Sequence, residues 1–591
     1  MVRLTALALV VLTTTAGCRT TSDGALREAP PKPDAALRRE LRDALSSLDP
    51  VEGEAFLDYL ARARAAFAAD DRPRVRGIVS WLPDDAVFFR DGLAGFVAPV
   101  LLSSWARSRS TEARVEALRS LVRHPTFNAP DSETPGRSSA FDALEADLKA
   151  RAEGLGLSFV DVDHVAYEIG FSDLEARPRA RTVGVLVHAD VVPADEPGWT
   201  APPFEGIVTD DRVLGRGALD DKGPLVAALF AIAALHDSGV PLYRHPALVV
   251  GTSEETHWEG IDRLVKARGL PEALFVADGG FPAGIGEKGI ATVRVRTQPF
   301  VAAASDPTAR VRLVALSGGQ VSNQVPATAE ARLQPRSGAA ADLAAQLLAR
   351  ASGRQGMALA VDVNEGAVRV RAEGKAAHSA DPAAGHNAIA DLVRFLVEDA
   401  ALEQSPCQGL LALLDARVGL GTSGEGIGVP DAHPAFTPTT VNLGLLQQAE
   451  DGSCTATLNV RWPPPRTTEE VVRSIEASLK EAASAAPFGP LSVEVKGGGL
   501  DPFLIDEKST LVSSLLSAYG AVTGEEARGV TLSGTTYAKA VPGGGVTFGP
   551  GEKDEGGERI HAPNEHITFE ELARLVELYT FALADLGRVP R

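Results

Sequence analysis

The stretch Thr182-Val-Gly-Val-Leu-Val-His188-Ala-Asp190 decides the fold class of this 591-residue chain, because an apolar run ends on an imidazole and a carboxylate. Similar apolar runs occur at Ala247–Thr252 and Ala273–Val276, and a helical pattern at Gly223–His236 separates the first two runs. Short buried strands that alternate with helices are typical of parallel sheets. The sequence therefore predicts an α/β fold.

The residue pattern changes several times along the chain. Residues 1–18 have the composition of an export signal, and 19–108 consist of a polar linker followed by a helical extension rich in Ala, Leu and Arg. The strand–helix alternation occupies 109–290 and returns at 500–591, whereas 291–499 is rich in strands of alternating polarity. We therefore predict one domain in two parts that is interrupted by another, and no internal repeat stands out.

The first segment, MVRLTALALVVLTTTAGC, predicts where the protein goes. Its apolar run, Leu4–Leu12, is too short to span a bilayer but fits a secretory signal. The ending Thr15-Ala-Gly-Cys18 resembles a bacterial lipobox, in which the Cys is lipidated. We expect an exported lipoprotein of the cell envelope, periplasmic or in the outer membrane, whose membrane contact is the lipid on Cys18. The alternative is an ordinary signal peptide with an incidental Cys.

Composition excludes several classes of protein. Apolar residues make up 45% and charged residues 23%, which is ordinary for a soluble globular protein. The net charge of −20 repels phosphate backbones, so we expect no nucleic-acid partner. Only 3 Cys occur, which excludes a disulfide scaffold. Cys407 and Cys454 could form one bridge, but their spacing does not decide this.

Carboxylates and imidazoles gather where apolar strands end or helices begin. Carboxylates at the end of a buried strand are costly unless they are paired or bound to a metal. In open α/β sheets the carboxyl ends of the strands are also where ligands bind. Each cluster alone has an ordinary structural explanation, but together they indicate a metal site. The clusters are His188-x-Asp190, Gly217-x-x-Asp220-Asp221-Lys222-Gly223, Glu254-Glu255, Asp278 and His561.

In this order the clusters resemble the signature of the di-zinc exopeptidases, over about residues 111–591. That family includes PepV-type dipeptidases, carnosinases, aminoacylases and the ArgE–DapE deacylases of amino-acid biosynthesis. The segments His188–Pro193 and Asp220–Pro224 look most like the dipeptidase branch. The resemblance implies a mixed sheet flanked by helices. It makes 109–290 and 500–591 the catalytic domain, and 291–499 an inserted α+β lid domain.

The resemblance also implies a role for each cluster. Asp220 would bridge two divalent metal ions, with His188 and Asp278 on one ion and Glu255 and His561 on the other. Asp190 would orient His188, and Glu254 would act as general base. We expect zinc, although cobalt and manganese also accept such ligands. The family further implies a cis peptide bond between Asp220 and Asp221.

The predicted lid contributes residues through the same resemblance. His378, in Gly374–Ser379, would stabilise the oxyanion, and Asn323 would contact the substrate. Arg461 would bind the terminal carboxylate of the substrate, a bidentate task that suits Arg, unless it is only an exposed strand residue. Gly534 and Thr535 would lie in a loop beside the site. Lys539 stands where relatives often carry Arg, and it receives no definite role.

The other histidines are interpreted as structural. His257 could approach the metals, but we favour a hydrogen-bonded loop residue. The remaining ones without a metal or oxyanion role are His124, His164, His236, His245, His386, His433 and His566.

Together these features predict an exported metallo-dipeptidase that acts on small peptides with a free carboxylate end. The alternatives are an N-acyl-amino-acid amidohydrolase and an inactive peptide-binding lipoprotein. Because dipeptidase-like relatives with a large lid fold two halves together, we expect a monomer. The preferred dipeptide and the role of the extension cannot be read from the sequence.

Overall fold

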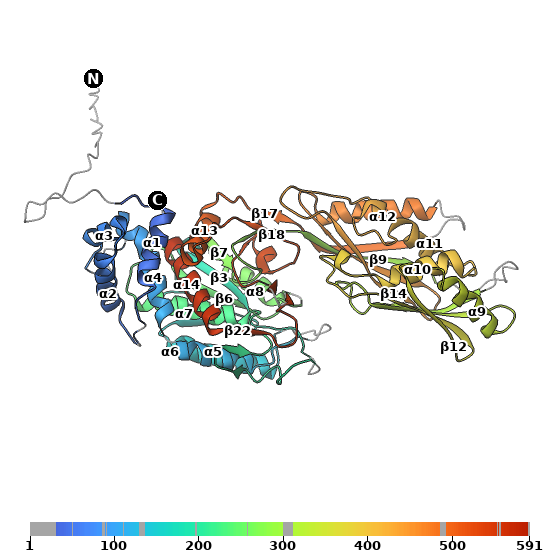
Figure 1. The fold of residues 1–591 in the computed structure, drawn as a ribbon, viewed down its shortest axis with the longest axis horizontal. Coiled ribbons are helices and arrows are strands. Elements are labelled where there is room, and N and C mark those ends of the chain that lie inside the picture. Colours follow the sequence, from blue (N-terminus) through green and yellow to red (C-terminus); the bar gives the residue numbers. More distant parts are fainter. Residues whose placement is uncertain are drawn as a thin grey trace, which may run out of the picture.

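The computed structural model describes residues 31–588, apart from 50, 52, 85–88, 90–91, 110, 129–135, 195–197, 257, 300–310, 485–491, 552 and 555–556. The predicted signal and Cys18 therefore lie outside the described residues, as does His257. Within the described part of the chain, no helix combines the length and the apolar character that crossing a bilayer demands. Figure 1 shows two lobes side by side, with the N-terminal helices at one end.

The first lobe is built on a nine-stranded mixed sheet in the order β1-β2-β6-β3-β7-β19-β8-β17, with β18 beside β8. The strands β6, β3 and β7 are parallel neighbours at its centre. Two predicted strands have the observed bounds, β3 (Thr182–His188) and β7 (Ala273–Val276), and β6 spans His245–Gly251. The other strands are β1 (Ser158–Val162), β2 (Ala166–Gly170), β8 (Gly284–Glu287), β17 (Phe503–Leu504), β18 (Val530–Leu532) and β19 (Val546–Thr547).

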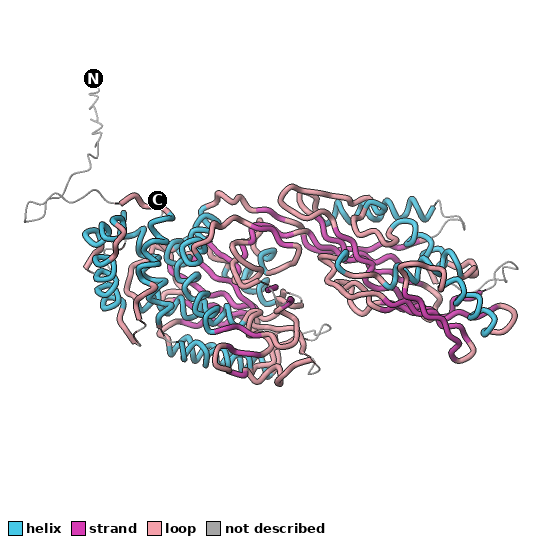
Figure 2. The backbone as a smooth tube through the Cα atoms, viewed as in Figure 1, coloured by secondary structure: helices cyan, strands magenta, loops and turns pink. Residues whose placement is uncertain are grey.

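Helices flank this sheet, so the predicted α/β class is confirmed (Figure 2). The helix α7 is apolar along most of its length and buried, and α14 packs against it. The helices are α5 (Thr111–Val122), α6 (Ser139–Gly154), α7 (Lys222–Asp237), α8 (Glu259–Arg268), α13 (Thr510–Thr523) and α14 (Phe569–Leu586). Small sheets at the periphery contain β4 (Ile207–Val208), β5 (Arg212–Leu214) and β22 (His566–Thr568), and β20 (Lys553–Asp554) with β21 (Gly557–Glu558).

The second lobe is an eight-stranded antiparallel sheet in the order β12-β13-β11-β10-β14-β15-β9-β16. Alternate residues of β9 are buried, so the valines face the core while Arg294 and Arg296 are exposed. Its strands are β9 (Gly289–Thr297), β10 (Val311–Gly318), β11 (Thr328–Pro335), β12 (Ala358–Asn364), β13 (Ala367–Glu373), β14 (Thr440–Gln448), β15 (Cys454–Trp462) and β16 (Val493–Leu500). Its helices are α9 (Ala340–Ala351), α10 (Ala388–Asp399), α11 (Pro406–Arg417) and α12 (Thr468–Ser484).

The second lobe corresponds to the predicted lid. Its sheet has two halves of similar strand order, which meet where β10 pairs with β14. In one half β10 and β11 are followed by α9 and the hairpin β12–β13, and in the other β14 and β15 are followed by α12 and β16. The strand that completes the second half is β9, which comes first in the chain. A repeat whose last strand precedes the others is hidden from a search along the sequence. Cys407 of α11 is bonded to Cys454 of β15, with their Cα atoms 5.2 Å apart, which settles the pairing that spacing left open.

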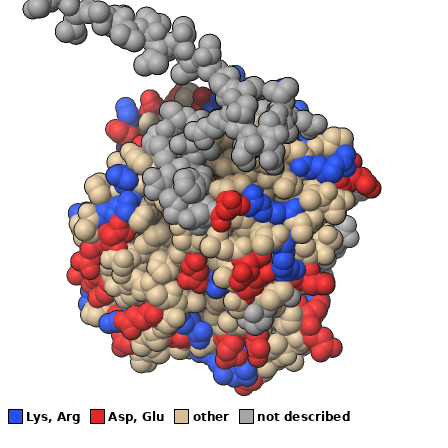
Figure 3. All heavy atoms as spheres, turned by 90° about the vertical axis from the view of Figure 1, so that its left-hand side faces the viewer, with Lys and Arg blue, Asp and Glu red and all other residues tan. Residues whose placement is uncertain are grey.

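The N-terminal extension is helical, as predicted, and packs on the first lobe. Its helices are α1 (Ala35–Leu45), α2 (Phe56–Ala69), α3 (Pro73–Ile78) and α4 (Gly92–Ser108). The helix α4 lies along α14, and α1 contacts α13. The apolar side chains of the extension and of the central sheet belong to one continuous core. Figure 3 views this end of the molecule, where basic and acidic side chains are interspersed.

Candidate metal centre and active site

Three parallel strands deliver the predicted acidic and imidazole groups to one edge of the sheet. His188 is the last residue of β3, and it is paired in register with Gly251, the last residue of β6. Glu254 and Glu255 follow β6 after Thr252 and Ser253, and Asp278 follows β7 after Ala277. Because β6, β3 and β7 are neighbours, their carboxyl ends bring these side chains together.

Asp220 lies between two imidazoles. One carboxylate oxygen, Oδ1, is 3.0 Å from His188 Nε2, and the other, Oδ2, is 3.1 Å from His561 Nε2. His561 Nε2 is also 2.8 Å from Glu255 Oε1. The peptide bond between Asp220 and Asp221 is cis, which confirms that prediction.

These residues fit a pair of cations. The donor set is made of imidazole nitrogens and carboxylate oxygens, which suits zinc and similar divalent ions. His188, Asp220 and Glu255 each offer a ligand atom, and these atoms lie within 4.8 Å of one another. The second ring nitrogen of His188, Nδ1, is 2.9 Å from the backbone oxygen of Asp190, so Nε2 is left to face the site.

The charges of the site favour the same conclusion. Burial raises the pKa of Asp278 to about 7, and the Asp220 carboxylate adds to the shift. Burial also raises the pKa of Glu254 and of Asp221 well above their usual values. Although burial opposes it, hydrogen bonds with His188 and His561 lower the pKa of Asp220. A cluster of carboxylates that resists full ionisation is stabilised when cations bind to it.

The Asp190 carboxylate positions the segment that carries Glu254 and Glu255. Its carboxylate oxygens accept hydrogen bonds from the backbone N–H groups of Glu254 and Glu255, both at 3.0 Å. The distance from its Oδ1 to His188 Nδ1 is longer, 3.6 Å. Asp190 therefore contacts His188 mainly through its backbone, while its carboxylate fixes the segment that carries the two glutamates.

A second cluster forms around Arg461 of β15. The guanidinium is buried, with Nη2 3.4 Å from His378 Nε2 and 3.3 Å from Ser379 Oγ, and Nε 3.2 Å from Asn459 Oδ1. The alternative that Arg461 is an exposed strand residue is therefore wrong. The backbone N–H of Ser379 donates to the backbone oxygen of Asn323 at 2.9 Å. The structure thus brings the predicted residues of the lid together.

Arg461 also connects the two lobes. Its Nη1 donates to the backbone oxygen of Ser533 at 2.5 Å, directly before Gly534 and Thr535. The Thr535 hydroxyl is buried and has no hydrogen-bond partner among the described residues. Thr536, next along, donates its hydroxyl to Glu287 Oε1 at 2.7 Å. Glu287, which the sequence analysis left without a role, therefore anchors this loop.

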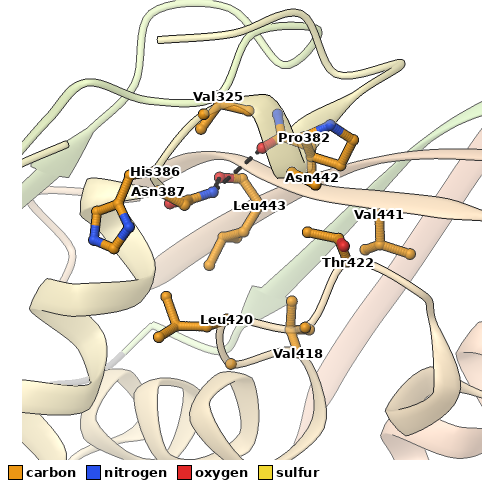
Figure 4. A pocket seen from close by; sticks show the side chains of 14 residues that line it. Val325, Pro382, His386, Asn387, Val418, Leu420, Thr422, Val441, Asn442 and Leu443 are labelled. Carbon is orange, nitrogen blue, oxygen red and sulfur yellow. Dashed lines mark hydrogen bonds between the residues drawn. The ribbon is translucent and has the colours of Figure 1, made fainter. Parts of the chain in front are cut away.

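A pocket of about 250 Å³ lies in the lid, behind the loop that carries Asn323 (Figure 4). Asn387 and Asn442 both line this pocket, and Asn387 Nδ2 donates to Asn442 Oδ1 at 3.2 Å. Asn442 Nδ2 donates in turn to the backbone oxygens of Ser322 and Gln324, on either side of Asn323. Asn442 could not be predicted from the sequence, because an amide that binds backbone oxygens leaves no recognisable motif.

Imidazoles and carboxylates arranged around one shared carboxylate, at the carboxyl edge of an α/β sheet, define a metal-dependent hydrolase. Residues 184–585 match Peptidase family M20/M25/M40, and the chain belongs to that family of metallopeptidases. A provisionally named dipeptidase of Staphylococcus aureus strain USA300 is 30% identical over 434 residues, which cover 73% of this chain and 87% of the relative. A similarly named protein of the bovine strain RF122 is 31% identical over the same lengths.

Solved structures of similar proteins include two dipeptidases. Human carnosine dipeptidase 1 is 16% identical, covers 81% of this chain and 97% of its own, and has a TM-score of 0.46. The di-peptidase Dug1p from Saccharomyces cerevisiae is 15% identical, with the same coverage and TM-score.

Proposed function

We propose that the chain is an exported dipeptidase in which two zinc ions share Asp220. The observation that carries the proposal is the placement of His188 and His561 at opposite oxygens of that carboxylate, at 3.0 and 3.1 Å. His188 and Asp278 would hold one ion, and Glu255 and His561 the other. When bound, such ions polarise a carbonyl group and lower the pKa of water.

Glu254 would be the general base. It neighbours the ligand Glu255, and Asp190 holds the backbone N–H groups of both residues. Burial raises the pKa of Glu254, so its carboxylate takes up a proton more readily than an exposed glutamate does. After accepting the proton from water, it could pass that proton to the leaving amine.

The Arg461 cluster would select the substrate. A planar guanidinium binds a carboxylate through two parallel hydrogen bonds, which suits the free end of a dipeptide. His378 lies beside it and would donate to the oxyanion. Asn323, Gly534 and Thr535 would complete the substrate contacts.

Hydrolysis of matched substrates tests this proposal. A dipeptide should be cleaved before chelation, spared afterwards and cleaved again when zinc or manganese is restored. Its carboxy-terminal amide should be a poor substrate, because it offers Arg461 no carboxylate. Faster cleavage of N-acetyl amino acids than of free dipeptides would point instead to an amidohydrolase. A protein that neither cleaves any of them nor binds metal would overturn the assignment.

Export and quaternary structure form part of the same proposal. Lipidation of Cys18 would place the enzyme in the cell envelope, and the paired halves of the lid would let it act as a monomer. Cell fractionation of the wild type and Cys18→Ser tests the first point. The second is tested by light scattering, which should give the mass of one chain.

A further inference from the structure

A buried carboxylate outside the predicted ligand set holds the loop that carries Asp220. Glu565 is 1% exposed and lies a few residues after His561 in the sequence. Its Oε1 accepts hydrogen bonds from the backbone N–H groups of Leu219 at 2.9 Å and Asp220 at 3.0 Å. Its Oε2 accepts one from Arg216 Nη1 at 2.6 Å. Both oxygens are therefore used within one loop.

Burying the Glu565 carboxylate destabilises the fold unless a positive charge compensates for it. A buried carboxylate costs free energy unless it is paired and hydrogen-bonded, and Glu565 lies near the negative charge of Asp220. Arg216 supplies the compensating charge and is itself only 3% exposed. Its guanidinium lies 5.4 Å from the centre of the Trp199 ring. A bare structural contact between two loops would not need an ion pair placed this deep.

The same segment is tied to its surroundings at several points. The Glu565 backbone oxygen accepts from the N–H of Gly215 at 2.9 Å. Asn564 Oδ1 accepts from the N–H of Thr200 at 2.7 Å, and its Nδ2 donates to the Gly198 oxygen at 3.1 Å. The backbone that carries His561 is thereby fixed to the backbone that carries Asp220.

We propose that Glu565 is a positioning residue that sets Asp220 between His188 and His561, so that both cations can bind. The inference rests on the proposed function, because it requires Asp220 to bridge two ions. Glu565 would act through the backbone of Asp220, because both of its carboxylate oxygens are taken up by Leu219, Asp220 and Arg216. Partners of this kind typically contribute about 10–100-fold to metal affinity or activity.

The test compares Glu565→Gln with Glu571→Gln. An amide has one acceptor oxygen, so the side chain introduced by Glu565→Gln could serve either the two backbone N–H groups or Arg216, but not both. Glu571 is a matched control, because its carboxylate also accepts from an arginine, Arg559 at 2.8 Å, and from a backbone N–H, that of Thr568 at 2.8 Å. It does so in the capping box of α14.

Each metal-free protein is titrated with Co²⁺ and followed by its visible absorption spectrum and by competition with a chelator. We expect wild type and Glu571→Gln to bind two ions alike, and Glu565→Gln to lose about 10–100-fold in affinity with an altered spectrum. At saturating Co²⁺, its KM for a dipeptide should stay unchanged while kcat falls. A purely structural role would lower thermal stability without changing Co²⁺ affinity.

Three outcomes would overturn the inference. The first is wild-type Co²⁺ affinity and spectrum in a folded Glu565→Gln. If that variant does not fold, Arg216→Lys is tested in its place. The second outcome is then a Co²⁺ affinity of Arg216→Lys equal to that of the wild type. The third is a wild type that binds no Co²⁺, which would remove the proposed function as well. Two ions bound by wild type and by the variant alike would remove only the role of Glu565.

Discussion

A buried carboxylate of α14, Glu577, contacts two of the N-terminal helices, which allows a quantitative test of their role. Glu577 of α14 is 1% exposed and accepts hydrogen bonds from Arg42 Nε of α1 at 3.1 Å and Arg107 Nη1 of α4 at 3.2 Å. The double variant Arg42→Ala/Arg107→Ala leaves this carboxylate without either guanidinium. Removing the partners of a buried charge costs about 3–5 kcal/mol.

Solvent screening reduces that cost, so we expect the double variant to lower the free energy of unfolding by about 3 kcal/mol. The two arginine side chains are 27% and 26% exposed, and the pairs are therefore partly screened already. An unfolding entropy of about 2 cal/mol/K per residue gives roughly 1.4 °C per kcal/mol for a cooperative unit of about 350 residues, so Tm should fall by about 4 °C, measured by circular dichroism. Adding Glu577→Leu should recover most of the loss, because an apolar residue replaces a buried ion pair at little cost.

Glu570, in the same helix, provides a control for this prediction. Arg107 also pairs with Glu570, whose side chain is 61% exposed, so Glu570→Ala should change stability by less than about 1 kcal/mol. A double variant that melts with the wild type would refute the reasoning. So would a triple variant that melts no higher than the double, because the loss would then not come from an unpaired carboxylate.

Four further predictions concern the site and the fold. Glu254→Gln should lower kcat by about 10²–10⁴-fold while Co²⁺ titration still finds two ions, and loss of metal binding would contradict a general base. Arg461→Lys should raise KM for dipeptides, measured by steady-state kinetics, because an ammonium cannot form the paired hydrogen bonds, and an unchanged KM would exclude carboxylate binding. Replacing Cys407 and Cys454 by Ala should cost about 4 kcal/mol in the chain-entropy estimate for a bridge spanning 47 residues, seen as a lower Tm than the oxidised wild type. Although burial opposes it, hydrogen bonds from His124, Ser120 and Arg151 lower the pKa of Asp147 to about 2. The ionised Asp147 therefore adds to the free energy of unfolding above about pH 4, and this stabilisation is lost as the pH falls toward 2. The difference in urea midpoint between wild type and Asp147→Asn should shrink over that range of pH.

The elements that the sequence predicted best are the most uniformly buried. The expected bounds of β3 and β7 agree with the structure, because both are uninterrupted apolar runs. The edge strand β16 was missed because Gly497, Gly498 and Gly499 carry no alternation. Burial thus determined which parts of the fold could be predicted.

The candidate site divides in the same way. His188, Asp220 and His561, which the structure brings together, stood out because their residue types suit metal ligands and their order matches the signature of a known family. Glu565 and Asn442 could not, because each acts on backbone groups that every residue possesses. A side chain that binds the backbone is recognised only once the chain has folded around it.

Lys539 shows how the two lobes and the site are connected. The chain passes from the catalytic domain to the lid between Glu287 and Gly289, and it returns after Leu500. Lys539 Nζ donates to the backbone oxygen of Asp501 at 2.7 Å and lies 3.8 Å from Glu287 Oε2, so it contacts both passages. Because Glu287 also accepts the Thr536 hydroxyl, the carboxylate that anchors the Gly534–Thr535 loop is part of the junction. Lys539, Glu287 and Thr536 therefore link the passages between the two lobes to the loop that carries Gly534 and Thr535.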